Sequence, residues 1–544
     1  MNICKQIFTS ALLLTFMVIG LPARSETIEL SSVTIQDINN AFDAGTLNSE
    51  KLVELFLARI KAYDDTGPSL NAVIVVNPQA LSRAKKLDAE RKRSGRRSPL
   101  HGIPVVLKDN IDTADMPTTA GSFMLKGSIP PDDAFIVKKL REAGAIILAK
   151  VNMSEFAIAG ISSLGGRTRN PHNLARSPGS SSSGTGAAIA AVYAMAGLGT
   201  DTGGSIRGPS SYNGIVGLRP THALVSRDGV VPLASSFDTV GPMARSVYDV
   251  AVMLGVMAGV DAADNTTRKS EGKFEKDYTQ YLDASALQGA RIGVLRDFMG
   301  QNGEGGWGGE ADWLVEAALD DMKRAGATLI DITFPDWFIK LQMSLGYDIT
   351  WREFSEQIPH YLATLGKAYP KTLDDLIERS MTLTAPSKDG IIPHPRVWAY
   401  MLHQHKKSAS VKNDYQHQVV YEHAMPLIRY MIENAMASDK LDAMVYPTLS
   451  NPAPLVDTDP HPAKHVVYPK SALLLAKLTG FPDLVVPAGF TSMGLPVTIS
   501  FLGKEFSEPK LLALGYAFEQ RTNALRLPVT TPALPGEKIL VSKK

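Results

Sequence analysis

The sequence predicts an α/β fold in which a large mixed, mostly parallel twisted sheet is covered by helices on both faces. Three observations support this prediction. Hydrophobic residues make up 44% of the 544 residues and charged residues 20%, as in a globular protein with a large core. Between residues 100 and 201, short apolar runs alternate with helical patterns, which is typical of strands joined by crossover helices. Apolar runs return after residue 440, so the end of the chain is expected to rejoin the same sheet.

The first 25 residues differ from the rest of the chain. Lys5 supplies a positive charge, residues 7–20 form an apolar run that is short for a membrane span, and Ala23 and Ser25 are small residues at the spacing of a signal-peptidase site. We expect residues 1–25 to be a signal peptide cleaved near Ser25, which makes the mature protein periplasmic or secreted, without stable membrane insertion. An uncleaved membrane anchor is the alternative.

Charge and cysteine content exclude several classes of function. The formal net charge is +1, which gives no electrostatic argument for a nucleic-acid partner. The only cysteine, Cys4, lies in the predicted signal peptide, so the mature chain would hold no disulfide and no cysteine nucleophile. His403 and His405 are two residues apart in a helical pattern and therefore point in different directions, which argues against a metal site. We expect no metal and no cofactor.

Residues 26–261 are expected to form the first part of the core. Apolar residues at helical spacing between residues 32 and 62 predict an early helix. The apolar run at residues 102–107 predicts a buried strand, with Lys108 at or just beyond its end. Residues 133–153 predict an amphipathic helix, a break at Gly144 and a second buried strand.

The remaining elements complete the expected sheet. Residues 186–200 are apolar on nearly all sides and predict an internal helix that leads into a short strand before Asp201. Residues 262–440 predict a variable, mainly helical insertion with a glycine-rich loop near residues 300–310. Residues 441–544 predict strands and helices that rejoin the core.

Two clusters rich in serine and glycine flank this internal helix: "SPGSSSSG" before it and "DTGGS", residues 201–205, after the strand. A catalytic serine needs an exposed hydroxyl, a base and backbone donors for the oxyanion. Gly203 and Gly204 permit a turn in which the N–H groups of Thr202, Gly203, Gly204 and Ser205 converge. A plain turn with Ser205 as the N-cap of the next helix is the alternative.

The base must come from elsewhere in the chain. No histidine lies near either cluster in a recognisable pattern, and no G-x-S-x-G elbow surrounds Ser181 or Ser205. Lys108 is a candidate, because burial at the end of a strand lowers the pKa of a lysine and leaves a neutral amine that can accept a proton. An exposed strand-end lysine is the alternative.

Several stretches in the same order resemble the amidase signature family. They are "LHGIPVVLKDNIDT", the serine cluster from Pro178, "GTDTGGSIRGPSSYNGIVGLRPT" and "SSFDTVGPMARSVYDVA". The resemblance spans residues 50–255 well and the last part of the chain more loosely. It implies the amidase signature fold and the hydrolysis of carboxamides by a triad of two serines and a lysine, in which the bridging serine follows a cis peptide bond.

The resemblance assigns the base to Lys108, the bridging serine to Ser181 and the nucleophile to Ser205. It implies that the N–H groups of residues 202–205 hold the oxyanion. Asp201 and Arg207 flank the nucleophile and are expected to hold the turn, with a simple surface ion pair as the alternative. The chain departs from the family pattern "GGSSGG" because serines stand at positions 180 and 183.

Taken together, these features predict a secreted amidase that cleaves a carboxamide through an acyl-Ser205 intermediate and releases ammonia or an amine. Its expected partner is a small amide or amidated peptide, because the serine cluster and the predicted export resemble the peptide-amidase branch more than the cytosolic proteins that act on charged transfer RNA. We expect a monomer or homodimer. The alternatives are a periplasmic solute-binding protein and a catalytically inactive protein of the same fold.

Overall fold

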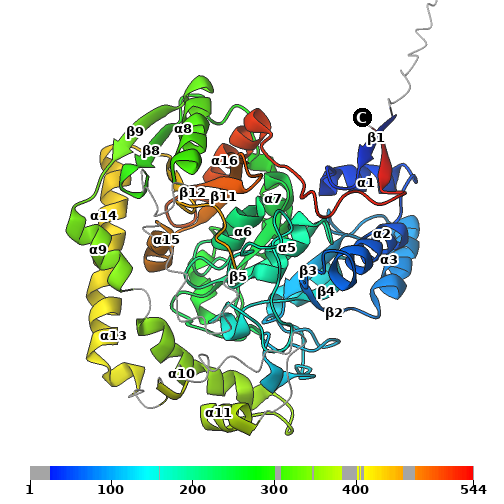
Figure 1. Ribbon diagram of the computed structural model, residues 1–544, viewed down its shortest axis with the longest axis horizontal. Coiled ribbons are helices and arrows are strands. Elements are labelled where there is room, and N and C mark those ends of the chain that lie inside the picture. The colour runs from blue at the N-terminus through cyan, green and yellow to red at the C-terminus, as the bar shows by residue number, and fades with distance from the viewer. Residues whose placement is uncertain are drawn as a thin grey trace, which may run out of the picture.

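A computed structural model describes residues 25–158, 160–299, 308–345, 348–382, 401–403, 405, 410–456 and 472–542. An eleven-stranded sheet forms its centre, and helices flank it (Figure 1). In spatial order the strands are β2 (Val73–Val76), β4 (Ile146–Val151), β3 (Pro104–Lys108), β5 (Ala196–Asp201), β7 (Thr239–Ala244), β6 (Val216–Arg219), β11 (Asp483–Phe490), β12 (Pro496–Leu502), β10 (Ala443–Pro447), β8 (Arg291–Leu295) and β9 (Thr328–Ile332).

Helices are distributed along the whole described chain. They are α1 (Ile35–Asp43), α2 (Ser49–Ile60), α3 (Ala80–Ser94), α4 (Phe135–Glu142), α5 (Ser183–Ala190), α6 (Arg207–Asn213), α7 (Val247–Met257), α8 (Gly308–Arg324), α9 (Asp336–Ser344), α10 (Asp348–Thr364), α11 (Leu373–Thr382), α13 (Tyr415–Val419), α14 (Met425–Ser438), α15 (Leu473–Thr479) and α16 (Glu508–Thr522). None of the described helices is long and apolar enough to cross a membrane.

The predicted mixed sheet with flanking helices is confirmed, but its pairing is less parallel than expected. Among the described strands, four pairings are parallel, namely β4 with β3, β3 with β5, β10 with β8 and β8 with β9. The other six pairings of the central sheet are antiparallel. The chain passes from β6 to β7 and from β11 to β12 without a helix between them, and strands joined in this way pair antiparallel.

Most elements predicted in the first half of the core are present. The strand predicted at residues 102–107 is β3, and Lys108 is its last residue. The internal helix is α5, and β5 follows it and ends at Asp201. The early helix is divided into α1 and α2, because the side chain of Asn48 accepts the Lys51 N–H and starts a new helix there.

The prediction of a mainly helical segment at residues 262–440 missed two strands. Both β8 and β9 lie in this segment and extend the central sheet beyond β10, with α8 between them in the chain. Their sequences, "RIGVL" and "TLIDI", are short and contain charged residues, so their apolar pattern is weak. In Figure 1, α9, α13 and α14 of this segment lie along the left side of the molecule, and α10 and α11 lie at the bottom.

The two ends of the described chain meet in a small separate sheet. Strand β1 (Ser25–Glu29) pairs antiparallel with β13 (Lys538–Ser542). The predicted signal peptide before residue 25 and most of the predicted loop at residues 300–310 lie outside the described residues. The first described strand, β1, begins at Ser25, the residue at which the sequence predicts cleavage.

Candidate active site

The candidate base lies at the end of a central strand. Strands β3 and β5 are parallel neighbours, so their carboxyl ends reach the same edge of the sheet. Lys108 ends β3 and is fully buried. Its Nζ atom lies 2.7 Å from Ser181 Oγ and 2.8 Å from Thr200 Oγ1 in β5. The structure therefore brings Lys108 to the first serine cluster, and the alternative of an exposed lysine is wrong.

Burial lowers the pKa of Lys108 to about 7, although the nearby carboxylates of Asp201 and Asp238 act in the opposite direction. A neutral amine has two N–H donors and one lone pair. The hydroxyl and carbonyl oxygens of Thr200, at 2.8 and 3.4 Å, can accept the two N–H groups. The lone pair is then left for the hydroxyl proton of Ser181, which is the arrangement that a general base requires.

Ser181 lies two residues before the first residue of α5, on a segment that hydrogen bonds to other parts of the chain hold in place. The peptide bond between Ser180 and Ser181 is cis. The carbonyl oxygen of Ser181 accepts the Ser154 N–H at 3.1 Å, and the hydroxyls of Ser154 and Ser180 lie 2.8 Å apart. The N–H of Ser182 donates to the carbonyl oxygen of Ser205 at 3.2 Å. The two serine clusters, well separated in the sequence, therefore lie side by side.

Ser205 lies in the turn between β5 and α6 and is partly exposed. The N-cap of α6 is Ile206, so Ser205 is not the cap that the alternative interpretation of the turn required. Gly204 has φ of +121°, a backbone conformation that residues with a side chain rarely adopt. The Ser205 hydroxyl is therefore not used to cap α6.

The backbone donors of this turn differ from the expected set in one residue. The Gly204 N–H donates to Asp201 Oδ1 at 2.8 Å, so it is not free to hold an oxyanion. Asp201 takes this donor because its carboxylate folds back over the turn that follows it. Among the described residues, no acceptor bonds the N–H groups of Thr202, Gly203 or Ser205. These three N–H groups remain candidates for the oxyanion site.

Asp201 is the centre of a buried ionic network. Its carboxylate accepts the Ile206 N–H at 3.0 Å and contacts Arg207 at 3.1 Å and Arg219 at 2.9 Å. Arg207 also contacts Asp483 of β11 at 2.8 Å. Burial acts to raise the pKa of Asp201, but the two guanidinium groups outweigh it and hold that pKa below its usual range. The side chains of Asp201 and Arg207 are fully buried, so the alternative of a surface ion pair is wrong.

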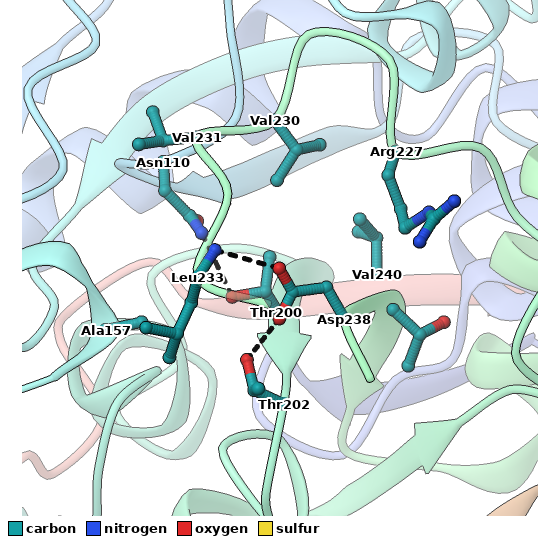
Figure 2. Close-up of a pocket in the computed structure, with 11 residues that line it drawn as sticks. Asn110, Ala157, Thr200, Thr202, Arg227, Val230, Val231, Leu233, Asp238 and Val240 are labelled. Atoms are coloured by element: carbon teal, nitrogen blue, oxygen red, sulfur yellow. Dashed lines mark hydrogen bonds between the residues drawn. The ribbon is translucent and has the colours of Figure 1, made fainter. Parts of the chain in front are cut away.

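Figure 2 shows a small pocket whose lining includes residues that the sequence did not single out, and one of them, Thr200, also contacts Lys108. Asn110 donates to Thr200 Oγ1 at 3.1 Å, and the Asp238 carboxylate contacts the hydroxyl of Thr202 and accepts the Leu233 N–H at 2.9 Å. Thr200 directly precedes the "DTGGS" stretch, on a strand parallel to β3. Its position next to that stretch is the sequence feature that could have indicated a place in the site. The contact of Asp238 with Thr202 joins segments 36 residues apart, for which the sequence carries no signal.

Among the described residues, no group of three or more histidine, cysteine, aspartate or glutamate side chains is placed to bind a metal ion.

Comparison with known proteins agrees with this geometry. A model of one protein family, described as Amidase, matches residues 51–512. The chain belongs to the amidase family. As an amidase, it is a hydrolase of carbon–nitrogen amide bonds. A probable amidase from Arabidopsis thaliana is 35% identical over 512 residues, which cover 92% of this chain and 91% of that protein.

Solved structures and other relatives fall into more than one branch of the family. The crystal structure of a peptide amidase from Stenotrophomonas maltophilia has a TM-score of 0.80 and 38% identity, covering 92% of this amidase and 99% of that chain. A glutamyl-tRNA(Gln) amidotransferase component from Halorhodospira halophila is also 38% identical, over 90% of this amidase and 97% of that protein. Sequence identity therefore does not decide whether this amidase is more similar to the peptide amidase or to the amidotransferase component.

Proposed function

We propose that this amidase hydrolyses a carboxamide through an acyl-enzyme on Ser205, with Lys108 as the base and Ser181 as the group that passes the proton between them. The observation that carries the proposal is the 2.7 Å contact between the buried Lys108 amine and the Ser181 hydroxyl. This contact lies beside a turn that presents Ser205 and three N–H groups without an acceptor among the described residues. A neutral amine, an intermediate hydroxyl and a nucleophilic hydroxyl are the parts that activation of a serine requires.

In the first half of the reaction, Ser205 Oγ attacks the amide carbonyl carbon. Its proton passes to Ser181 as the Ser181 proton passes to Lys108. The carbonyl oxygen becomes an oxyanion, which the N–H groups of Thr202, Gly203 and Ser205 would hold. When the intermediate collapses, the carbon–nitrogen bond breaks and the proton returns from Lys108 through Ser181 to the leaving nitrogen. Ammonia or an amine leaves, and Ser205 carries an ester.

In the second half, water replaces the amine. A water molecule attacks the ester carbonyl and gives its proton to Lys108 through the same hydroxyl, and the second tetrahedral intermediate uses the same N–H groups. Breakage of the bond to Ser205 Oγ returns the proton to Ser205 and releases a carboxylic acid. The sum of the two halves is one amide and one water converted to one acid and one ammonia or amine.

For the substrate, we propose a peptide C-terminal amide or a small aliphatic or aryl amide. The likeness to the peptide amidase and the absence of an excess positive charge support this class over transfer RNA. We also propose export with cleavage near residue 25. The sequence of residues 1–25 supports it, and cleavage after Ser25 would remove only the first residue of β1.

A screen of amidated peptides and simple amides against the purified chain from residue 26 tests the function. We expect ammonia release together with the mass change of an amide converted to an acid. A solute-binding protein would retain a compound without converting it, and an inactive protein of this fold would do neither. Fractionation of the producing cells, with mass spectrometry of the mature N-terminus, tests the export: a start near residue 26 supports it, and an intact Met1 in the cytoplasm contradicts it.

A further inference from the structure

A second lysine is buried beside the nucleophile turn. Lys477 lies in α15, and only 3% of it is exposed. Its Nζ atom lies 2.9 Å from Thr350 Oγ1 in α10 and 4.4 Å from the centre of the Phe237 ring. A methyl group built on Gly203 would lie 3.9 Å from the same Nζ atom. The amine therefore packs against Gly203, one of the candidate oxyanion donors.

Helix α15 also contacts the turn at Gly204 and Arg207. Leu473 is four residues before Lys477 and so lies on the same face of the helix. A methyl group on Gly204 would lie 3.0 Å from the Leu473 side chain, and the Leu473 carbonyl oxygen accepts Arg207 at 2.8 Å. The two glycines of the turn therefore face two residues of α15, and the charged one of these two lies against Gly203.

The charged groups around Lys477 come from four other elements or their ends. Burial and the Arg219 guanidinium of β6 oppose a charge on Lys477, whereas the carboxylates of Asp238 before β7, Glu353 of α10 and Asp201 of β5 favour it. The result is a pKa lowered to about 7. Lys477 is therefore positively charged in acid solution, about half charged near pH 7 and neutral above that range.

We propose that Lys477 is a positioning residue for the hydrolysis proposed above, on which this inference rests: its ammonium group, held by Thr350, places a positive charge against the turn in which the oxyanion forms. The substrate carbonyl is neutral and the tetrahedral intermediate is an anion, so the charge stabilises the intermediate more than the substrate. It acts on kcat rather than on KM. Thr350 belongs to α10, so the segment at residues 262–440 contributes to the chemistry of the site.

The two buried lysines must be in opposite protonation states for the reaction. Lys108 must be neutral to accept a proton, whereas Lys477 must be charged to stabilise the oxyanion. Activity therefore rises with pH as Lys108 loses its proton and falls as Lys477 loses its own, which gives a bell-shaped profile of kcat against pH.

The test compares four proteins on one C-terminally amidated dipeptide: the parent, Lys477→Met, Thr350→Val and Lys139→Met. Met keeps the length of the side chain without the charge, and Val removes the hydroxyl that holds the amine. Lys139 of α4 is a half-buried lysine outside the site and serves as the matched control. Each rate is divided by the number of sites that a fluorophosphonate labels, so that misfolded protein does not count.

We expect Lys477→Met to lower kcat per labelled site about tenfold or more at pH 6.5, with KM within about twofold, because it removes a charge near the oxyanion but no direct donor. The alkaline limb of the pH profile disappears in this variant. Thr350→Val moves kcat in the same direction by less, and Lys139→Met leaves it unchanged.

An unchanged kcat and an unchanged alkaline limb in Lys477→Met would overturn the inference, as would a rise in KM alone. If Lys477→Met does not fold, Thr350→Val decides: a lower kcat with an altered alkaline limb supports the inference, and a parental profile overturns it. Failure of the proposed function looks different, because the parent itself then releases no ammonia and takes no label at Ser205.

Discussion

The Lys108 amine lies 2.7 Å from the Ser181 hydroxyl, although 73 residues separate the two in the chain. Two features of the fold produce this contact. Parallel pairing of β3 with β5 brings Lys108 to Thr200, and the segment before α5 is bonded through Ser182 to Ser205. The proposed proton path is thus a consequence of strand order and not of local sequence.

Replacement of the base tests this path. We expect Lys108→Met to lower kcat by about 10⁴-fold, because a thioether accepts no proton. The variant should unfold at the same temperature as the parent or higher, since burial of the lysine disfavours its charged form. Lys138→Met is the control, because that lysine forms an exposed ion pair with Asp132 and lies outside the site. Ammonia release and thermal unfolding measure both effects.

The acid limb of the pH profile follows from the lowered pKa of Lys108. Catalysis needs the neutral amine, so kcat/KM should rise as the pH rises from acid values toward about 7, and the fall above that range is the limb assigned to Lys477. The folded pKa lies below the unfolded value, so between these two values the unfolded chain binds a proton that the folded chain lacks. The parent should therefore gain stability relative to Lys108→Met as the pH rises above about 7. Activity that stays constant from pH 5 to pH 8 would be inconsistent with this assignment.

Local patterns in the sequence indicated Lys108 and the two serine clusters but left alternatives open, and the roles of Lys108, Ser181 and Ser205 came from the resemblance to the amidase signature family. Lys108 follows an apolar run, and Ser181 and Ser205 lie in clusters whose glycines and serines have no use in a buried helix. The contacts of Thr200 and Asp238 could not be predicted, because they depend on which strands and loops become neighbours. The role expected of the Gly204 N–H was wrong for a related reason: spacing does not show that Asp201 accepts it.

The strands of the sheet likewise include some that the sequence predicted and some that it did not. β3, β4 and β5 were predicted because buried parallel strands are continuous apolar runs. β9 was missed because it is the edge strand and only its last residue is buried, whereas β8 is buried over four residues but its apolar run is short. The connections after β6 and β11 explain two of the six antiparallel pairings, and composition carries no information about the strand order that produces the other four.

The two glycines of the nucleophile turn should respond differently to alanine. Gly204→Ala places a methyl group 3.0 Å from Leu473 in a backbone with φ of +121°, so we expect a loss of about 1–3 kcal/mol of stability and a clear loss of activity. Gly203→Ala meets Lys477 only at 3.7 Å, an ordinary contact, and should fold like the parent. Urea denaturation of the pair checks this, and equal losses in the two variants would contradict the described turn.

Asp201→Asn removes the charge between two buried guanidinium groups. We expect it to cost about 3–5 kcal/mol in the free energy of unfolding, because Arg207 and Arg219 keep their charges. The pKa of Asp201 is lowered in the fold, so the parent keeps this stabilisation above the ordinary aspartate pKa and loses it only as pH falls through the lowered value. The difference should thus be the same at pH 5 and pH 8. Glu54→Gln, at the exposed pair with Lys51, should change stability by less than about 1 kcal/mol.

Covalent labelling by a fluorophosphonate, read by peptide mass spectrometry, tests the central claim most directly. We expect one adduct, on Ser205, absent from Ser205→Ala and formed far more slowly in Lys108→Met and Ser181→Ala. An adduct on another residue, or a labelling rate that Lys108→Met leaves unchanged, would contradict the proposed path from Ser205 through Ser181 to Lys108.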